Sequence, residues 1–345
     1  MSSADGAERR TSLLRVKLRA LVTSHWTDAA DTEPASVAEG VALQAGGRAW
    51  VLVEEPDRGR GFGRALLWGL HRRCEELHVL MDDPFSADTA ARQAACFRMP
   101  VTVWSIEGRE LVRVEPSPLS PEPPLDPDVE PLIPVIEAAG AEPVVEWGRL
   151  TAEVLGLQVG EALTGEEGPW IEVGIGRHDR LAAALAWADV PPQEALARIV
   201  EIASDARRSE RSRPLNQIGR ERWLRHRLVR NPGFVGARRL EPVAPPVPLT
   251  DLRAPLLAPA AGEGTGGRQI LAACSVGFDP AFIPMAAELR AARFPKAELV
   301  LVLPKRDVHP LIREAAADIR DGATIRTVPD DWHADSLFGF SGSQA

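Results

Sequence analysis

Hydrophobic and polar residues alternate along the first third of the chain in a way that predicts strands separated by helices. Short apolar runs predict strands, and apolar residues at helical spacing predict helices. The predicted strands span 48–54, 77–82, 101–106 and 110–115, and the predicted helices span 12–25, 62–74 and 87–97. Residues 28–40 indicate a loop. Strands that alternate with helices at this pitch indicate βαβ crossovers, so we expect a mostly parallel sheet.

The middle of the chain has a different pattern. Residues 116–131 contain seven prolines and predict an extended linker. We then expect a helix at 131–139, a strand at 143–146, a hairpin of strands 153–163 and 170–176 with a turn at 164–168, and helices at 179–188, 192–208 and 215–230. One face of the hairpin carries glycines, among them Gly156 and Gly160, so another group is expected to approach its backbone closely.

The last third of the chain repeats the strand–helix alternation. A stretch rich in proline, alanine and glycine, 242–267, predicts a second linker. Strands are predicted at 269–276, 298–303 and 324–328, with helices at 280–293 and 310–320 between them. The whole pattern predicts an α/β protein in which two β-α-β-α-β units flank a mixed α+β middle segment. The expected parts are an N-terminal domain (1–115), a linker (116–131), the middle segment (132–241), a second linker (242–267), a C-terminal unit (268–333) and a flexible tail (334–345).

Composition limits the classes of protein that fit this pattern. The chain has 345 residues, which favours two or three domains. Its polar N-terminus and the lack of a long apolar run predict a cytoplasmic protein with no membrane contact. Three widely spaced cysteines indicate buried thiols in a reducing compartment. The net charge of −9 argues against nucleic acid as a partner, and the absence of tyrosine excludes any mechanism that needs a phenol.

The sharpest local signal is a stretch rich in glycine and arginine, residues 58–67, between a predicted strand and a predicted helix. Such a junction exposes backbone N–H groups at the positive end of a helix, which suits a pyrophosphate. The stretch resembles the pyrophosphate-binding motif of the acetyl-CoA-dependent N-acetyltransferase (GNAT) superfamily. The resemblance covers residues 48–106 and implies that acetyl-CoA is held by Arg58, Gly61, Gly63 and Arg64. A glycine-rich surface turn is the alternative.

A second candidate site lies at the end of the predicted strand 170–176. Glu172 lies on this strand, and other glutamates, Glu146, Glu153 and Glu161, are near in sequence. Restriction-endonuclease-like nucleases hold a divalent metal with carboxylates of this kind, and the metal activates water. The candidate catalytic residues are Glu172, Arg177, His178 and Asp179. The alternative is that Arg177 and Asp179 pair with each other or cap the next helix.

A third candidate is the arginine-rich run 207–230. It contains nine arginines and two glutamates, a local formal charge of +7. An apolar stripe on the predicted helix leaves Arg220, Arg227 and Arg230 outward, where they can contact an acidic partner or an acidic part of the same chain. Trp223 could then stack on a base if the partner were a nucleic acid.

The sequence as a whole predicts a ligand-binding or partner-binding protein without assignable catalysis. An acetyltransferase-like protein that uses acetyl-CoA is the first alternative. A metal-dependent nuclease-like protein is the second.

Overall fold

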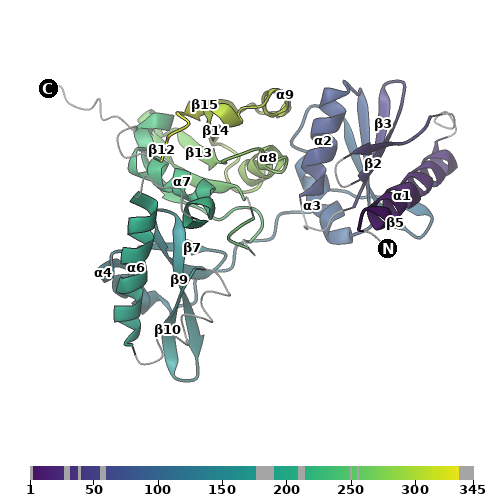
Figure 1. Cartoon of the computed structure of the whole chain (residues 1–345). Helices are drawn as coiled ribbons and strands as arrows, with labels where there is room; N and C mark the ends of the chain where they lie inside the picture. Colours follow the sequence, from purple (N-terminus) through teal and green to yellow (C-terminus); the bar gives the residue numbers. More distant parts are fainter. Residues whose placement is uncertain are drawn as a thin grey trace. The chain divides into compact units, whose positions relative to one another are not determined.

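The computed structural model describes residues 3–26, 32–37, 40–54, 60–175, 190–208, 214–248, 251–254 and 256–333. Within these residues the protein is an α/β protein with three β-sheets (Figure 1). The chain divides into two compact units. Unit 1 comprises Met1–Leu119, Pro280–Pro295 and Val308–Thr324, and unit 2 comprises Ser120–Asp279, Lys296–Asp307 and Ile325–Ala345. The boundary after Leu119 lies in the predicted proline-rich linker.

Unit 1 contains a six-stranded mixed sheet. Its strands, in their order across the sheet, are β1 (Ala35–Val37), β2 (Gly40–Ala45), β3 (Arg48–Val53), β4 (Glu76–Met81), β5 (Val101–Glu107) and β6 (Glu110–Arg113). The pairs β3–β4 and β4–β5 are parallel, and the other three pairs are antiparallel. The sheet is therefore mixed rather than mostly parallel, because β1 and β2 precede its parallel part. Both strands are additions to the predicted pattern, and β1 lies inside the stretch predicted to be a loop.

Five helices of unit 1 are described: α1 (Ser3–His25), α2 (Gly61–His71), α3 (Pro84–Ala94), α8 (Phe282–Arg293) and α9 (Pro310–Asp318). The buried Leu18 and Val22 of α1 pack with Trp50, Leu52 and Leu80 of the sheet to form one core. α1 is longer than predicted, and the residues before Ser12 whose burial is described are mostly exposed. That part of the helix has little apolar periodicity, so the hydrophobic pattern could not indicate it.

Helices α8 and α9 complete unit 1 although they come from the last quarter of the sequence. Glu288 of α8 is buried, and it accepts hydrogen bonds from Arg92 Nε at 2.7 Å and from Gln93 Nε2 at 3.0 Å. Near α9, Arg98 donates to the carbonyl oxygen of Ala317 at 2.6 Å. α3 thus meets α8 through a buried carboxylate that is satisfied on both oxygens.

Unit 2 contains the other two sheets. The first has the order β10 (Gly168–Val173), β9 (Leu157–Gly165), β8 (Arg149–Val154) and β7 (Glu142–Glu146), and all its pairs are antiparallel. The second has the order β11 (Ala237–Pro242), β12 (Ala258–Gly264), β13 (Gln269–Cys274), β14 (Glu298–Pro304) and β15 (Thr324–Val328). The helices of unit 2 among the described residues are α4 (Ile133–Ala138), α6 (Pro192–Arg208) and α7 (Arg220–Arg230), with short 3₁₀ turns at Glu130–Leu132, Pro214–Gln217, Pro232–Val235, Thr265–Gly267 and Lys305–Asp307.

Two predictions for unit 2 were wrong. The predicted strand 153–163 is interrupted by a turn at Leu155 and Gly156, both of which have positive φ, at 48° and 73°. The apolar character of this turn concealed it. The predicted second linker, 242–267, contains β12, which lies inside its sheet between β11 and β13. Its small residues are needed there, because a Cβ at Gly262 would lie 1.9 Å from the carbonyl oxygen of Arg239.

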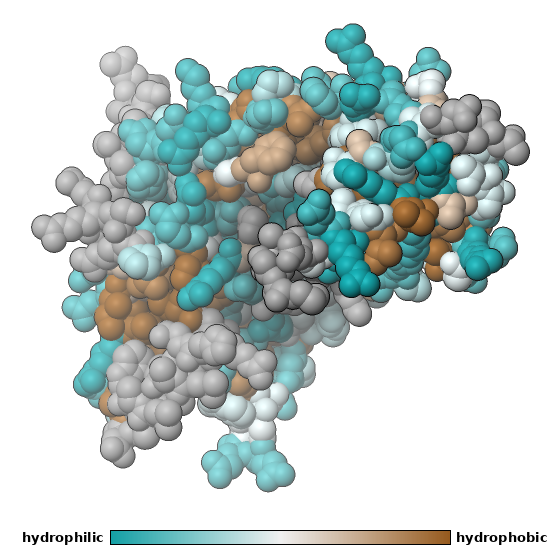
Figure 2. Space-filling view, turned by 45° about the vertical axis from the view of Figure 1, so that its right-hand side comes forward, coloured by the Kyte–Doolittle hydropathy of each residue, from teal (hydrophilic) through white to brown (hydrophobic). Residues whose placement is uncertain are grey.

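On the face drawn in Figure 2, hydrophilic residues predominate and hydrophobic areas lie between them. Leu13 and Val16 of α1 are among the exposed large hydrophobic residues. Within the described residues, no helix combines the length and the apolar character that a membrane crossing requires. The cysteines Cys74, Cys96 and Cys274 are free and buried.

Candidate functional site

The glycine-rich junction places α2 directly behind β3, as predicted, with Gly61 as its first residue. Gly61 and Gly63 are both buried. A Cβ at Gly63 would lie 2.1 Å from the carbonyl oxygen of Pro280, so this glycine allows two backbone segments of unit 1 to approach closely. Arg64 is half-buried, and Arg58 lies outside the described residues. The binding of acetyl-CoA by these four residues stays a prediction, and packing alone explains Gly63.

A cavity of about 220 Å³ lies at the carboxyl ends of β3 and β4 in unit 1. It is lined by Arg10, Val53, Glu54, Met81, Asp82, Asp83 and Ser86. Val53 and Met81 are buried, so the lining combines an apolar part with polar side chains from the strand ends and from α1 and α3. Ligands of open α/β sheets bind at the carboxyl ends of parallel strands. The cavity therefore lies where this architecture places binding sites.

Acidic side chains dominate the polar lining of the cavity. Arg10 of α1 pairs with Glu54 at 2.6 Å, and Lys17, two helical turns further, reaches both oxygens of Asp82 at 2.6 and 2.7 Å. Asp83 caps α3, since its Oδ2 accepts from Ser86 N at 3.0 Å. Three carboxylates and one guanidinium line the cavity, and Lys17 places a second positive charge beside Asp82. The sequence patterns did not indicate this site, although Glu54 and Asp82, the last residues of two predicted strands, were a usable signal.

The structure describes only part of the predicted metal site. Glu172 lies on β10, opposite Glu161 of β9, and Arg149 donates to Glu161 at 2.6 Å. The other three candidates, Arg177, His178 and Asp179, lie outside the described residues. In the described part of the chain, no group of three or more His, Cys, Asp or Glu side chains is arranged to hold a metal ion.

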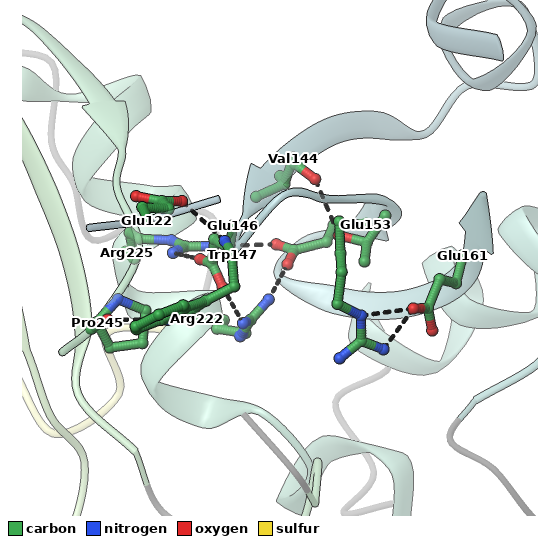
Figure 3. A network of polar contacts seen from close by, with 11 residues as sticks. Glu122, Val144, Glu146, Trp147, Glu153, Glu161, Arg222, Arg225 and Pro245 are labelled. Carbon is green, nitrogen blue, oxygen red and sulfur yellow. Dashed lines mark hydrogen bonds and ion pairs between the residues drawn. The ribbon is translucent and has the colours of Figure 1, made fainter. Parts of the chain in front are cut away.

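Glu146 and Glu153 belong to a buried network with two arginines of α7 (Figure 3). Arg222 donates to both glutamates, and Arg225 donates to Glu146 and, at 3.3 Å, to Glu153. All four side chains are buried. Burial raises the pKa of Glu146, but the charges of Arg225 and Arg222 outweigh burial and hold that pKa below its ordinary value. The two carboxylates are therefore neutralised by arginine, and they join β7 and β8 to α7.

The same region of unit 2 shows what approaches the glycine face of the predicted hairpin. A Cβ at Gly156 would lie 2.3 Å from the carbonyl carbon of Arg222, so the approaching group is the backbone of α7. Trp223 is buried beneath the guanidinium of Arg207, which lies 4.4 Å from its ring centroid. Trp147 Nε1 donates to the carbonyl oxygen of Pro245 at 3.0 Å (Figure 3). Trp223 is thus part of the core of unit 2 and does not offer a surface for stacking.

The three arginines predicted to face outward have different surroundings. Arg230 and His226 both bind Glu142 of β7, and Arg227 donates to the carbonyl oxygen of His333 at 2.8 Å. Burial raises the pKa of Glu142, but His226 and Arg230 outweigh it and lower the pKa to about 2. Arg220, at the start of α7, is half-exposed.

Comparisons with known proteins add no family to these observations. No protein-family model matches the chain, and neither the search of curated proteins nor that of solved structures gave a significant match.

Proposed function

We propose that this chain is a binding protein that takes a small ligand with a positively charged group into the cavity at the carboxyl ends of β3 and β4. The observation that carries the proposal is the cavity itself, with its position at the ends of parallel strands and its acidic lining. No catalytic step is assigned to it.

The size and charge of the cavity define the class of ligand. Its volume of about 220 Å³ is below the roughly 300 Å³ at which sites for drug-sized molecules begin. The carboxylates of the lining suit a cationic group, and the apolar part formed by Val53 and Met81 suits a short aliphatic stem. Arg10 and Lys17 form ion pairs with two of the carboxylates, Glu54 and Asp82. Guanidinium and ammonium groups of the chain itself are thus examples of the cationic group that we propose for the ligand.

The proposal is tested by calorimetric titration of the full chain with putrescine and agmatine, which carry ammonium and guanidinium groups. Asp83→Asn removes a charge and keeps an N-cap acceptor for α3, so the fold is retained. We expect binding that this variant weakens by roughly tenfold. Glu107→Gln, at the exposed end of β5, is the matched control and should bind as the natural chain does. Absence of binding by both amines, or equal weakening by both variants, would contradict the proposal.

A second candidate is acetyl-CoA binding at the glycine-rich junction. Its support is the position of α2, which starts behind a parallel strand with Arg60 as N-cap residue and Arg64 in its first turn. Titration with acetyl-CoA tests it, with Arg64→Gln as the variant and Arg109→Gln, in the exposed turn between β5 and β6, as the control. Binding that Arg64→Gln weakens and Asp83→Asn leaves unchanged would favour this candidate over the first.

A further inference from the structure

One histidine of unit 1 lies within a cluster of three tryptophans. His78 of β4 is 4% exposed. Its ring centroid lies 5.5 Å from that of Trp50 on β3, 6.1 Å from that of Trp104 on β5 and 5.0 Å from that of Trp26, directly after α1. The rings of Trp50 and His78 are stacked, with 18° between their planes. Trp26 also packs against Trp50 and Trp104, so the cluster joins the end of α1 to three strands of the sheet.

The two ring nitrogens of His78 have different surroundings. Trp104 Nε1 donates to His78 Nδ1 at 3.2 Å. An imidazole nitrogen accepts only while it carries no proton, so this bond requires the neutral ring with its proton on Nε2. Nε2 is buried and has no hydrogen-bond partner in the described part of the chain. Glu76 Oε1 lies 3.6 Å from Nε2, which is too far for a hydrogen bond but close enough to attract a positive charge on the ring.

We propose that His78 is a pH-sensitive switch, in which protonation of the imidazole breaks the hydrogen bond from Trp104 and releases that tryptophan from the cluster. A proton gained by the neutral ring binds to Nδ1, because Nε2 already carries one. The N–H groups of Trp104 Nε1 and His78 Nδ1 then point at each other, so one side chain must move. Trp104 is only half-buried, whereas His78 is buried and stacked on a neighbouring ring, so the tryptophan moves.

The protonated ring has partners that hold it in place once Trp104 has left. A cation within about 6 Å of a tryptophan ring centroid is attracted to the face of the ring. Trp50 and Trp26 are both within that range of His78. Glu76 supplies the opposite charge. Because Trp104 packs against Trp26 at 5.6 Å between centroids, its release also weakens the contact between the end of α1 and the sheet.

The charged groups around the cluster determine the pH at which the switch acts. Burial lowers the pKa of His78 below its ordinary value of 6.5; the charge of Glu76 raises this pKa, and the charge of Arg48 on β3 lowers it further. α1 and β6 contribute His25 and Glu110, whose Nε2 and Oε2 atoms lie 3.9 Å apart. The lowered pKa keeps the ring neutral at pH 7, and release is expected only as the pH falls below 6.5. The contribution of the neutral ring to stability is therefore complete above pH 6.5 and decreases below it.

A pH titration of the full chain, followed by ¹H–¹⁵N spectra, tests this proposal. The indole N–H resonance of Trp104 is assigned with Trp104→Phe. We expect this resonance to pass through one transition below pH 6.5, towards the position of an indole in water. His78→Asn keeps an acceptor oxygen near the position of Nδ1 but cannot be protonated, so it should abolish the transition. His71→Asn, at the exposed end of α2, is the matched control and should leave the transition unchanged.

A second readout does not require replacement of His78. Trp104→Phe keeps an aromatic ring but removes the donor that favours the neutral imidazole. The pH midpoint of the His78 ring protons should therefore rise by about one pH unit in this variant, which corresponds to the loss of one hydrogen bond. An unchanged midpoint would show that the bond from Trp104 does not control protonation, and would overturn the proposal.

Two further outcomes would also overturn it. The first is that the Trp104 resonance shows no transition before the chain unfolds in acid. The second is a transition that persists in His78→Asn and is lost in His25→Gln, which would assign the pH dependence to the histidine beside Trp26.

Discussion

At the scale of single residues, two helical glycines have opposite surroundings. Gly63 has backbone atoms of Pro280 where its Cβ would lie, whereas Gly6 of α1 has no atom within 4 Å of that position. The first glycine permits close packing in unit 1, and the second is only a weak helix former. The same substitution should therefore act in opposite directions at the two positions.

We expect Gly63→Ala to lower the free energy of unfolding by about 1–3 kcal/mol, because the backbone of Pro280 cannot yield as a flexible side chain would. Gly6→Ala should leave that free energy unchanged or raise it by less than about 1 kcal/mol. Denaturant unfolding of both variants measures the difference. Equal effects at the two positions would show that the close contact at Gly63 does not constrain the side chain.

Glu142 gives unit 2 a pH dependence whose direction follows from its lowered pKa. The pKa is about 2 in the folded chain, against an ordinary value of 4.5. The carboxylate therefore stabilises the fold above pH 4.5, and this contribution is lost as the pH falls from 4.5 towards 2. Unfolding of Glu142→Gln should be easier than that of the natural chain at pH 7, and the two should converge near pH 2. Glu137→Gln, exposed on α4, is the control and should show no such convergence.

At the scale of elements, the buried network of Glu146, Glu153, Arg222 and Arg225 joins the hairpin β7–β8 to α7. Each partner neutralises charge that would otherwise be buried without compensation. A buried ion pair stabilises a fold little more than a well-packed apolar pair does. Removal of one partner of the ion pair, however, strongly lowers the free energy of unfolding. The network therefore supports the contact between the hairpin and α7 only while all four partners are present.

Removal of one arginine from this network should cost more than removal of an arginine and a glutamate together. We expect Arg225→Met to lower the free energy of unfolding by about 3–5 kcal/mol, because it leaves two buried carboxylates with one arginine. Adding Glu146→Gln to this variant restores the balance with Arg222 and Glu153 and should recover part of the loss. A double-mutant cycle measures the coupling, and additive effects would contradict it.

The elements that the sequence predicted best are those with strong local patterns. The apolar runs of β13 and β14 and the Pro310 start of α9 gave nearly correct bounds. In the structure, His309 caps α9 by accepting a hydrogen bond from Leu311 N. The turn at Leu155 and Gly156 could not be found in this way, because its residues are apolar and only their positive φ distinguishes them. β12 was missed because it consists of small residues that usually mark loops.

The candidate sites were less predictable than the elements, because they depend on contacts between distant segments. Arg222 and Arg225 share a face of α7, but the glutamates that they bind lie 69 to 79 residues away in sequence. The cavity combines Arg10 with the ends of β3 and β4, which no local pattern connects. His333 likewise contacts Arg227 of α7 only in the folded unit.

At the scale of the whole molecule, unit 1 is assembled from three separate stretches of the chain. The sequence predicted an N-terminal domain that ends at residue 115. The structure adds α8 and α9 to it, with Glu288 buried against Arg92 and Gln93. Without these helices, the apolar and charged groups that they cover on α2 and α3 would be exposed to water.

A fragment of residues 1–119 should therefore fail to fold cooperatively. We expect it to lack a sharp thermal transition in circular dichroism and to bind a hydrophobic dye. The full chain should show a sharp transition and should not bind the dye. The reason is that Phe97, buried in the full chain, forms a bridge with Ile319 that the fragment cannot make. A cooperative transition in the fragment would show that α8 and α9 are dispensable for unit 1.

The order in which the ribosome delivers the chain gives this assembly a further consequence. The first 119 residues are made before the last part of unit 1, Val308–Thr324, and most of unit 2 lies between them in the chain. Most of unit 2 can fold in the meantime, while the surfaces of α2 and α3 that contact α8 and α9 in the native state stay exposed. The first third of the chain thus stays accessible to chaperones until Val308–Thr324 has been made, so unit 1, although begun first, reaches its native state only after most of unit 2 has been synthesised.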